Sequence, residues 1–225
     1  MALAPRTSSS LLEGFPYAVV VDGEGAEVHI VSAHERFRGE GGEVYYDCYD
    51  PDWTKLASRI GDPLLERVFG YGFPAHTVGP TATARLAWIN EAGVTDRIAP
   101  VALLTVRTVV RARIQDDDEE EEDEYDEDED EDDEEEEFLF EVHGVCVDEA
   151  ERGKGLGSAL MRSLDRILGE TRPVQVELHV DDATPTTDVL CRWYTERFGF
   201  AMRRRLSREV ALVLGKECCG GACAL

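Results

Sequence analysis

Short runs of apolar and β-branched residues alternate with stretches of helical periodicity along most of this chain. Such runs predict strands, whereas apolar residues that recur three and four positions apart predict helices. The predicted strands cover residues 17–21, 27–32, 82–90, 99–114, 138–147, 174–180 and 210–214. The predicted helices cover residues 53–60, 63–69, 156–168 and 184–198, and residues 45–49 fit either a strand or a loop. This order of elements indicates one α/β domain with a substantial core.

The clearest pattern is a strand, a polar break, a glycine-rich loop and a helix within residues 138–170. The loop reads Arg-Gly-Lys-Gly-Leu-Gly and lies at residues 152–157. Backbone N–H groups at such a helix start bind phosphate or pyrophosphate. Two nucleotide motifs do not fit, because Ser158 follows Gly157 where a Walker loop needs Lys, and because the glycines are spaced G-x-G-x-G rather than G-x-G-x-x-G. The sequence therefore predicts a phosphate-binding loop of another kind.

From Cys146 to Gly157, the sequence resembles without gaps the acetyl-CoA-binding motif of the GNAT superfamily of N-acetyltransferases, Arg-x-x-Gly-x-Gly after a strand. The resemblance is strongest over residues 138–200 and covers about residues 45–214. It implies an α/β acetyltransferase fold, in which a mixed central sheet carries flanking helices and two central parallel strands splay apart around pantetheine. Carried over, those two strands are residues 138–147 and 174–180.

The resemblance also implies that acetyl-CoA is the co-substrate and that the loop amides grip its pyrophosphate. It further implies that backbone groups of Val145 and Val147 face pantetheine and the thioester oxygen. The residues implied to bind the coenzyme are Val145, Cys146, Val147, Arg152, Gly153, Lys154, Gly155, Leu156, Gly157 and Ser158. A glycine-rich helix start without a ligand is the alternative for the same pattern.

Two titratable residues, Glu141 and His143, lie two positions apart on the predicted central strand and so share one face. The resemblance implies that a Glu or a His on this strand deprotonates the acceptor amine, directly or through water. Either residue, or the two as a pair, could serve as this base. The alternatives are a satisfied histidine under the sheet for His143 and a solvated strand end for Glu141.

Tyr194 lies on the predicted helix that ends before Gly199-Phe200, and this helix resembles the Tyr-containing helix of the same family. The resemblance implies that the Tyr194 hydroxyl protonates the leaving thiolate. The spacing here is one residue longer than the commoner family spacing, which falls on Thr195. The alternative is a core aromatic residue beside Trp193.

The net charge of −25 has one main source, the segment 116–137, which begins at Asp116 and ends at Glu137. Of its 22 residues, 21 are acidic and one is Tyr125, so removing these charges from −25 leaves −4 for the rest of the chain. Because the segment has little apolar surface and repels itself, residues 115–137 are predicted to be a disordered insertion in a hairpin. It is either inert or a polyanion that recruits basic proteins or polyamines, and direct nucleic-acid binding is not expected.

The expected organisation is a disordered lead at 1–16, one domain at 17–214 and a cysteine-containing tail at 215–225. An apolar run of about 18 residues is missing, so no membrane span is expected. Six cysteines in a chain of this length indicate a reducing compartment, cytoplasmic or nuclear. No histidine accompanies the tail cysteines Cys218, Cys219 and Cys223, so no metal site is expected.

Together these features predict an enzyme that transfers an acetyl group from acetyl-CoA to a primary amine by direct attack in a ternary complex. The acceptor is a small molecule or a protein or peptide. The alternative is a catalytically inactive acyl-CoA-binding regulatory protein whose acidic segment holds basic partners.

Overall fold

The computed structural model describes residues 12–39, 44–70, 72, 83–112, 136–169, 174–180, 187–205 and 212–218. The strands are β1 (Tyr17–Val21), β2 (Glu27–Ser32), β3 (Glu35–Arg38), β4 (Val44–Tyr46), β5 (Thr83–Asn90), β6 (Pro100–Ala112), β7 (Glu136–Val147), β8 (Val174–Val180), β9 (Ala201–Arg205) and β10 (Leu212–Cys218). The α-helices are α1 (Pro51–Phe69), α2 (Leu156–Arg162), α3 (Leu164–Leu168) and α4 (Thr187–Phe198). None of the described helices is long and apolar enough to cross a membrane.

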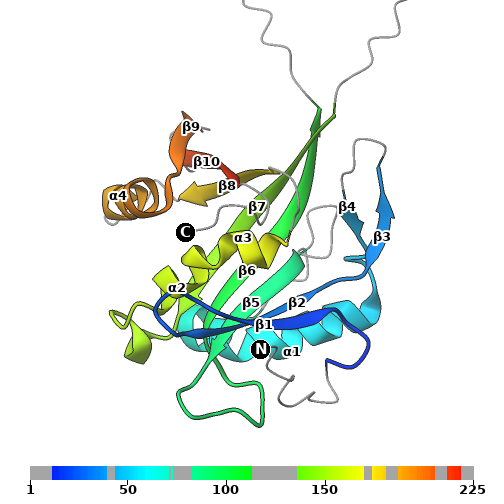
Figure 1. Ribbon diagram of the computed structural model, residues 1–225, viewed down its shortest axis with the longest axis vertical. Coiled ribbons are helices and arrows are strands. Elements are labelled where there is room, and N and C mark those ends of the chain that lie inside the picture. The colour runs from blue at the N-terminus through cyan, green and yellow to red at the C-terminus, as the bar shows by residue number, and fades with distance from the viewer. Residues whose placement is uncertain are drawn as a thin grey trace, which may run out of the picture.

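Eight strands form one sheet in the order β1-β2-β5-β6-β7-β8-β10-β9, and β3 pairs with β4 in a separate hairpin. Neighbouring strands of the large sheet are antiparallel except β7 and β8, which are parallel. Helix α1 lies against one face, and α2 and α3 lie against the other (Figure 1). The predicted mixed sheet with flanking helices is therefore confirmed.

Each face of the sheet carries its own apolar core. The core under α2 and α3 contains Leu160, Leu164 and Phe140, and the core under α1 contains Trp53 and Leu86. Strand β5 is buried from its first residue to its seventh, because helices cover both of its faces. Strand β7 likewise contributes buried residues to both cores, so its two faces do not divide into one apolar face and one solvent-facing face.

Helix α1 differs from the prediction of two helices at 53–60 and 63–69, since it runs unbroken through Pro63. A proline in a helix removes one hydrogen bond and disfavours the preceding turn. Here the buried residues Ile60 and Leu64 lie on both sides of Pro63 and belong to the same core, so packing keeps the helix continuous. The Asp50 side chain accepts a hydrogen bond from the helix start, and Gly70 in the left-handed conformation ends it.

Other boundaries also differ from the sequence pattern. The predicted helix 156–168 is divided at Ser163 into α2 and α3, and β10 continues to Cys218 rather than ending at 214. Strands β3 and β9 have no predicted counterpart, because both are short and rich in arginine. Residues 1–11 of the predicted lead lie outside the described residues, whereas Leu12 is buried in the core under α1. Residues 113–135, which include most of the acidic segment, also lie outside them, and β7 begins at Glu136.

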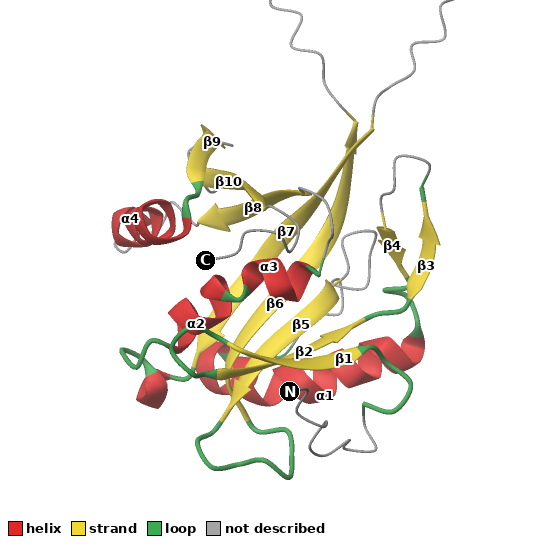
Figure 2. Cartoon of the chain, viewed as in Figure 1, coloured by secondary structure: helices red, strands yellow, loops and turns green. Residues whose placement is uncertain are grey.

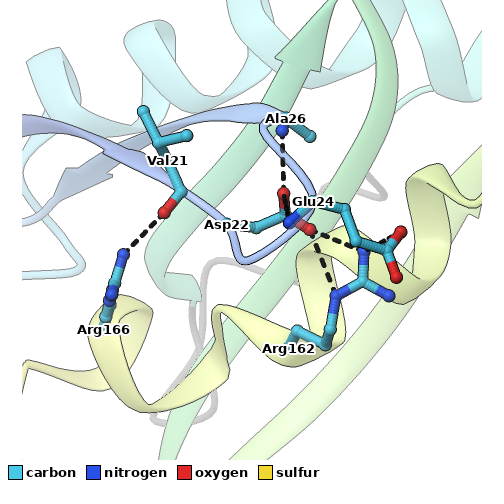
Figure 3. Close-up of polar contacts among 6 residues, drawn as sticks. All are labelled: Val21, Asp22, Glu24, Ala26, Arg162 and Arg166. Atoms are coloured by element: carbon cyan, nitrogen blue, oxygen red, sulfur yellow. Dashed lines mark hydrogen bonds and ion pairs between the residues drawn. The ribbon is translucent and has the colours of Figure 1, made fainter. Parts of the chain in front are cut away.

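The N-terminal hairpin, predicted at 17–21 and 27–32, is confirmed and is held against α2 by an ion pair (Figure 3). The Asp22 carboxylate accepts hydrogen bonds from Arg162 Nη2 at 2.6 Å and Nε at 3.1 Å, and from the turn amides of Ala26 and Glu24 at 2.7 and 3.0 Å. Arg166 donates to the Val21 carbonyl at 2.7 Å. These contacts fix the sheet edge to the helix that follows the glycine loop.

Candidate active site

The two parallel strands at the centre of the sheet pair over only three residues each. Strand β7 bonds to β8 through the pairs Phe140–Val176, Glu141–Glu177 and Val142–Leu178. Beyond the pair Val142–Leu178, β7 continues for five residues and β8 for two, and these residues do not pair with each other. The strands diverge from this point, as Figure 2 shows on the side of α2 and α4, so the predicted splay is confirmed.

A β-bulge lies at the point where the strands separate. On the opposite side of β7, Val142 pairs with Val106 and Gly144 pairs with Thr105, which leaves His143 as an extra residue in the strand. A bulge bends a strand and increases its twist, and this explains why β7 leaves β8 here. The structure therefore places His143 at the mouth of the gap between the strands.

The glycine-rich loop follows directly from the far end of β7. A 3-10 turn at Glu149–Glu151 begins at Asp148, whose carboxylate accepts a hydrogen bond from Ala150 N at 3.1 Å. The same carboxylate pairs with Arg67 Nε on α1 at 3.0 Å, so α1 and the core of the sheet fix the start of the loop. The loop is held at its base and exposed at its tip.

Gly153 and Gly155 have φ angles of +79° and +83°, a conformation that residues with a Cβ rarely adopt. Gly155 is the N-cap of α2, and no side chain caps this helix start. The amides of the first helical turn have no acceptor within the helix. The exposed cations Arg152 and Lys154 lie in the same loop, and Lys154 Nζ is ion-paired with Glu151 at 2.8 Å. The free amides and the Arg152 charge suit an anion such as a pyrophosphate.

Gly157 lies where α2 packs against the end of β7. A Cβ at this position would lie 3.5 Å from Val147 and 3.9 Å from Trp193, both ordinary contact distances. Val145 and Val147 are half-buried and pack against the core under α2, whereas Cys146 is buried in the core under α1. Burial raises the pKa of the Cys146 thiol to about 11, so this thiol stays protonated and contributes only its backbone to the site. Trp193 beside the gap is a residue that the sequence pattern did not single out for the site.

A row of charged side chains crosses three strands on one face of the sheet. Arg107 on β6 pairs with Glu141 on β7, and Glu141 pairs with Glu177 on β8. Arg107 Nη2 donates to both carboxylate oxygens of Glu141, at 2.8 and 2.9 Å. Glu141 is 3% exposed and Glu177 is 8% exposed. The sequence pattern missed Arg107 and Glu177, although a charge inside an otherwise apolar strand marks each of them.

Of the two candidate bases, Glu141 is buried and His143 is accessible. The His143 side chain is 38% exposed, and its Nδ1 lies 3.9 Å from Oε1 of Glu141. The structure therefore brings the two predicted residues together, with Glu141 held by Arg107 behind the imidazole. His143 is the one that an acceptor could reach.

The third predicted residue, Tyr194, is buried in the core under α2 and α3. Its ring packs edge-on against Trp193 at 4.7 Å and against Phe200 at 6.0 Å. Burial, followed by the neighbouring Cys191, raises the pKa of Tyr194 to about 12. The hydroxyl therefore stays protonated at neutral pH, and the role of Tyr194 as an acid remains a prediction.

Residues 110–200 match the model of the acetyltransferase (GNAT) family. The chain matches no curated protein sequence. Among solved structures, it is similar to Arabidopsis thaliana NAA60 in complex with acetyl-CoA, with 16% identity and a TM-score of 0.44 over 69% of this chain and 90% of that one. It is also similar to the NatC complex bound to Gag peptide and CoA, with 15% identity and a TM-score of 0.36 over 70% and 86% of the two chains. The family match spans the bulged strand, the glycine loop and α4, and it identifies residues 110–200 of this chain as belonging to the GNAT superfamily of N-acetyltransferases.

Proposed function

We propose that this protein is an acetyl-CoA-dependent N-acetyltransferase that acetylates a primary amine by direct attack in a ternary complex. The observation that carries the proposal is the position of His143 at the bulge where β7 and β8 separate, on the strand that leads directly into the glycine loop. Similar solved structures include one in complex with acetyl-CoA and one bound to a peptide and CoA, which agrees with this reading.

In this proposal, the loop from Arg152 to Ser158 holds the coenzyme pyrophosphate through its amides and its two cations. Pantetheine would lie in the gap between β7 and β8, where the backbone of Val145 and Val147 is not engaged by β8. A backbone N–H of this strand would donate to the thioester oxygen as negative charge develops there during attack.

His143 would accept the proton of the acceptor amine. Its Nδ1 lies on the side of Glu141, which leaves Nε2 for the amine. Glu141, fixed by Arg107, would orient the imidazole and stabilise its protonated form. The amine nitrogen then bonds to the acetyl carbon, the carbon–sulfur bond breaks, and the thiolate takes up a proton. Tyr194 is the proposed donor of that proton.

A screen for free CoA release tests the proposal directly. The panel comprises lysine peptides, peptides with free N-termini, a polyamine and a small alkylamine, each with acetyl-CoA. We expect amine-dependent release above spontaneous hydrolysis for at least one acceptor, with the acetylated product confirmed by mass spectrometry. Release that no amine stimulates would contradict the proposal.

The acidic segment supports a second candidate function, a catalytically inactive acyl-CoA-binding protein that holds basic partners. The segment joins β6 and β7, whose last pair is Ala112–Glu136, and Glu141 lies five positions after Glu136 along β7. At about 3.4 Å per residue, its ends start roughly 17 Å from the charged row. Coenzyme binding by calorimetry without turnover of any amine would favour this second function. In either case, we propose one acetyltransferase domain in a cytoplasmic or nuclear protein.

A further inference from the structure

We propose that the turn between β1 and β2 raises the affinity of this protein for CoA, because Asp22 in that turn holds the last residue of α2 in place. In the proposed function, the first amides of α2 contact the coenzyme pyrophosphate. Asp22 and Arg162 are then positioning residues, which act through α2 and do not contact the coenzyme. This inference rests on the proposed function and adds to it a turn residue that lies 140 positions before Arg162 in the chain.

Helix α2 has seven residues and is not the start of a longer helix. It ends at Arg162, and Ser163, with a φ of −86° and a ψ of 3°, separates it from α3. Isolated helices this short are marginal in water, so tertiary contacts hold α2 in place. Ala159, Leu160 and Met161 are buried and press α2 onto the sheet, but apolar contacts are not directional. Polar contacts at its ends therefore contribute most to the direction in which α2 points.

A network of polar contacts holds the last residue of α2 (Figure 3). Both Nε and Nη2 of Arg162 donate to Oδ2 of Asp22, at 3.1 and 2.6 Å, and Nη2 also donates to Glu24 at 2.9 Å. Oδ1 of Asp22 accepts from the amides of Glu24 and Ala26, at 3.0 and 2.7 Å. The Asp22 side chain is fully buried. The carboxylate thus accepts four hydrogen bonds, and two of them fix the Arg162 guanidinium.

The two ends of the unit formed by the glycine loop and α2 are held separately. The pair Asp148–Arg67 fixes the base of the loop, and Asp22 fixes the opposite end at Arg162. Arg162 lies seven residues after Gly155, roughly 10 Å along the helix axis. A tilt of about 10° over this length displaces one end relative to the other by roughly 2 Å. Because N–H···O bonds span only about 2.7–3.2 Å, such a displacement would separate the helix amides from a phosphate.

The charge of Asp22 makes the sign of its effect informative. CoA is an anion, so removal of a negative charge would by electrostatics alone tighten CoA binding. Weaker binding would therefore result from a change in the position of α2. An asparagine cannot reproduce the contacts, because each oxygen of Asp22 accepts from two donors. Its NH2 group would face either the turn amides or the guanidinium, and in both orientations donors would meet donors.

The first test measures the Kd of CoA by calorimetry for the wild type, Asp22→Asn and Arg162→Lys. We expect the Kd to rise at least fivefold in Asp22→Asn. It should rise at least threefold in Arg162→Lys, which keeps the charge but lacks the planar contact through two nitrogens. Asp50→Asn is the matched control, since it removes a carboxylate that accepts from an amide at the start of α1, and it should leave the Kd unchanged. Unchanged or tighter binding in Asp22→Asn, or an equal loss in Asp50→Asn, would overturn the proposal.

The second test reports on α2 without the coenzyme and separates a local effect from a general loss of stability. We expect Asp22→Asn to accelerate amide hydrogen exchange at residues 156–162 at least threefold more than it accelerates exchange in α1. An equal acceleration in the two helices would mean that only overall stability has changed, and this result would overturn the inference. Absence of CoA binding by the wild type would instead contradict the proposed function.

Discussion

The contact between Arg107 and Glu141 gives the sharpest prediction about stability. Arg107→Met would leave the Glu141 carboxylate buried without the guanidinium that now contacts both of its oxygens. Removing one partner of a buried ion pair costs about 3–5 kcal/mol. Because the Arg107 side chain is 20% exposed and that of Glu141 is 4% exposed, we expect the lower end of this range, about 3 kcal/mol. For a domain of this size, that corresponds to a fall in Tm of roughly 6–12 °C.

The assay is a double-mutant cycle of urea unfolding with Arg107→Met, Glu141→Gln and the two together. Removing both charges should restore part of the lost stability, giving a coupling energy of at least about 1.5 kcal/mol. The exposed pair Lys55–Asp52, with side chains 75% and 77% exposed, is the control, and its cycle should give less than about 0.5 kcal/mol. A coupling between Arg107 and Glu141 as small as that of the control would refute the buried row.

Three further predictions concern other parts of the molecule. Gly155→Val should weaken CoA binding at least tenfold by calorimetry, about 1.4 kcal/mol. Gly93→Val, at a similar φ of +80° on the turn between β5 and β6, is the control and should leave CoA binding unchanged. An equal loss of CoA affinity in both variants would mean that backbone strain alone is responsible. Burial would raise the pKa of Asp22, but hydrogen bonds from Arg162 and two amides, with the Arg162 charge, lower it overall. The contribution of the Asp22 carboxylate to stability is therefore present above about pH 4 and lost as pH falls through its lowered pKa. Asp22→Asn should reduce the free energy of unfolding more at pH 7 than at pH 2. An equal reduction at the two pH values would contradict the ion pair. Replacing residues 116–135 with a short Gly/Ser turn should leave kcat and Tm unchanged but raise the KM of a strongly basic acceptor at about 50 mM salt, and an unchanged KM there would make the segment an inert insertion.

The centre of the fold was predictable because it depends on local patterns. The apolar run that ends at Val147 and the glycines before Leu156 predict a strand, a loop and a helix without tertiary information. The sheet then follows from the order of the elements. The same local reasoning failed at Pro63, where the burial of Ile60 and Leu64 in a shared core outweighs the propensity of proline to end a helix.

The candidate site was predictable only in part, because its geometry depends on pairing between strands. Glu141 and His143 could be singled out as titratable residues on the central strand. The bulge at His143 is a property of its register with β6, and the sequence of β7 does not reveal it. The roles of Arg107 and Glu177 likewise depend on which residues lie opposite Glu141 on two other strands.

The most direct test of the central claim is the kcat/KM of His143→Gln for the best acceptor from the screen, measured from pH 6 to pH 9. We expect a loss of about 10²-fold or more, in line with the removal of a general base, with acetyl-CoA affinity unchanged. His34→Gln, an exposed histidine that stacks on Phe15, is the matched control and should retain wild-type turnover. If His143→Gln retains wild-type kcat/KM across this pH range, acetyl transfer does not depend on the residue at the mouth of the gap between β7 and β8, and the proposed mechanism is wrong.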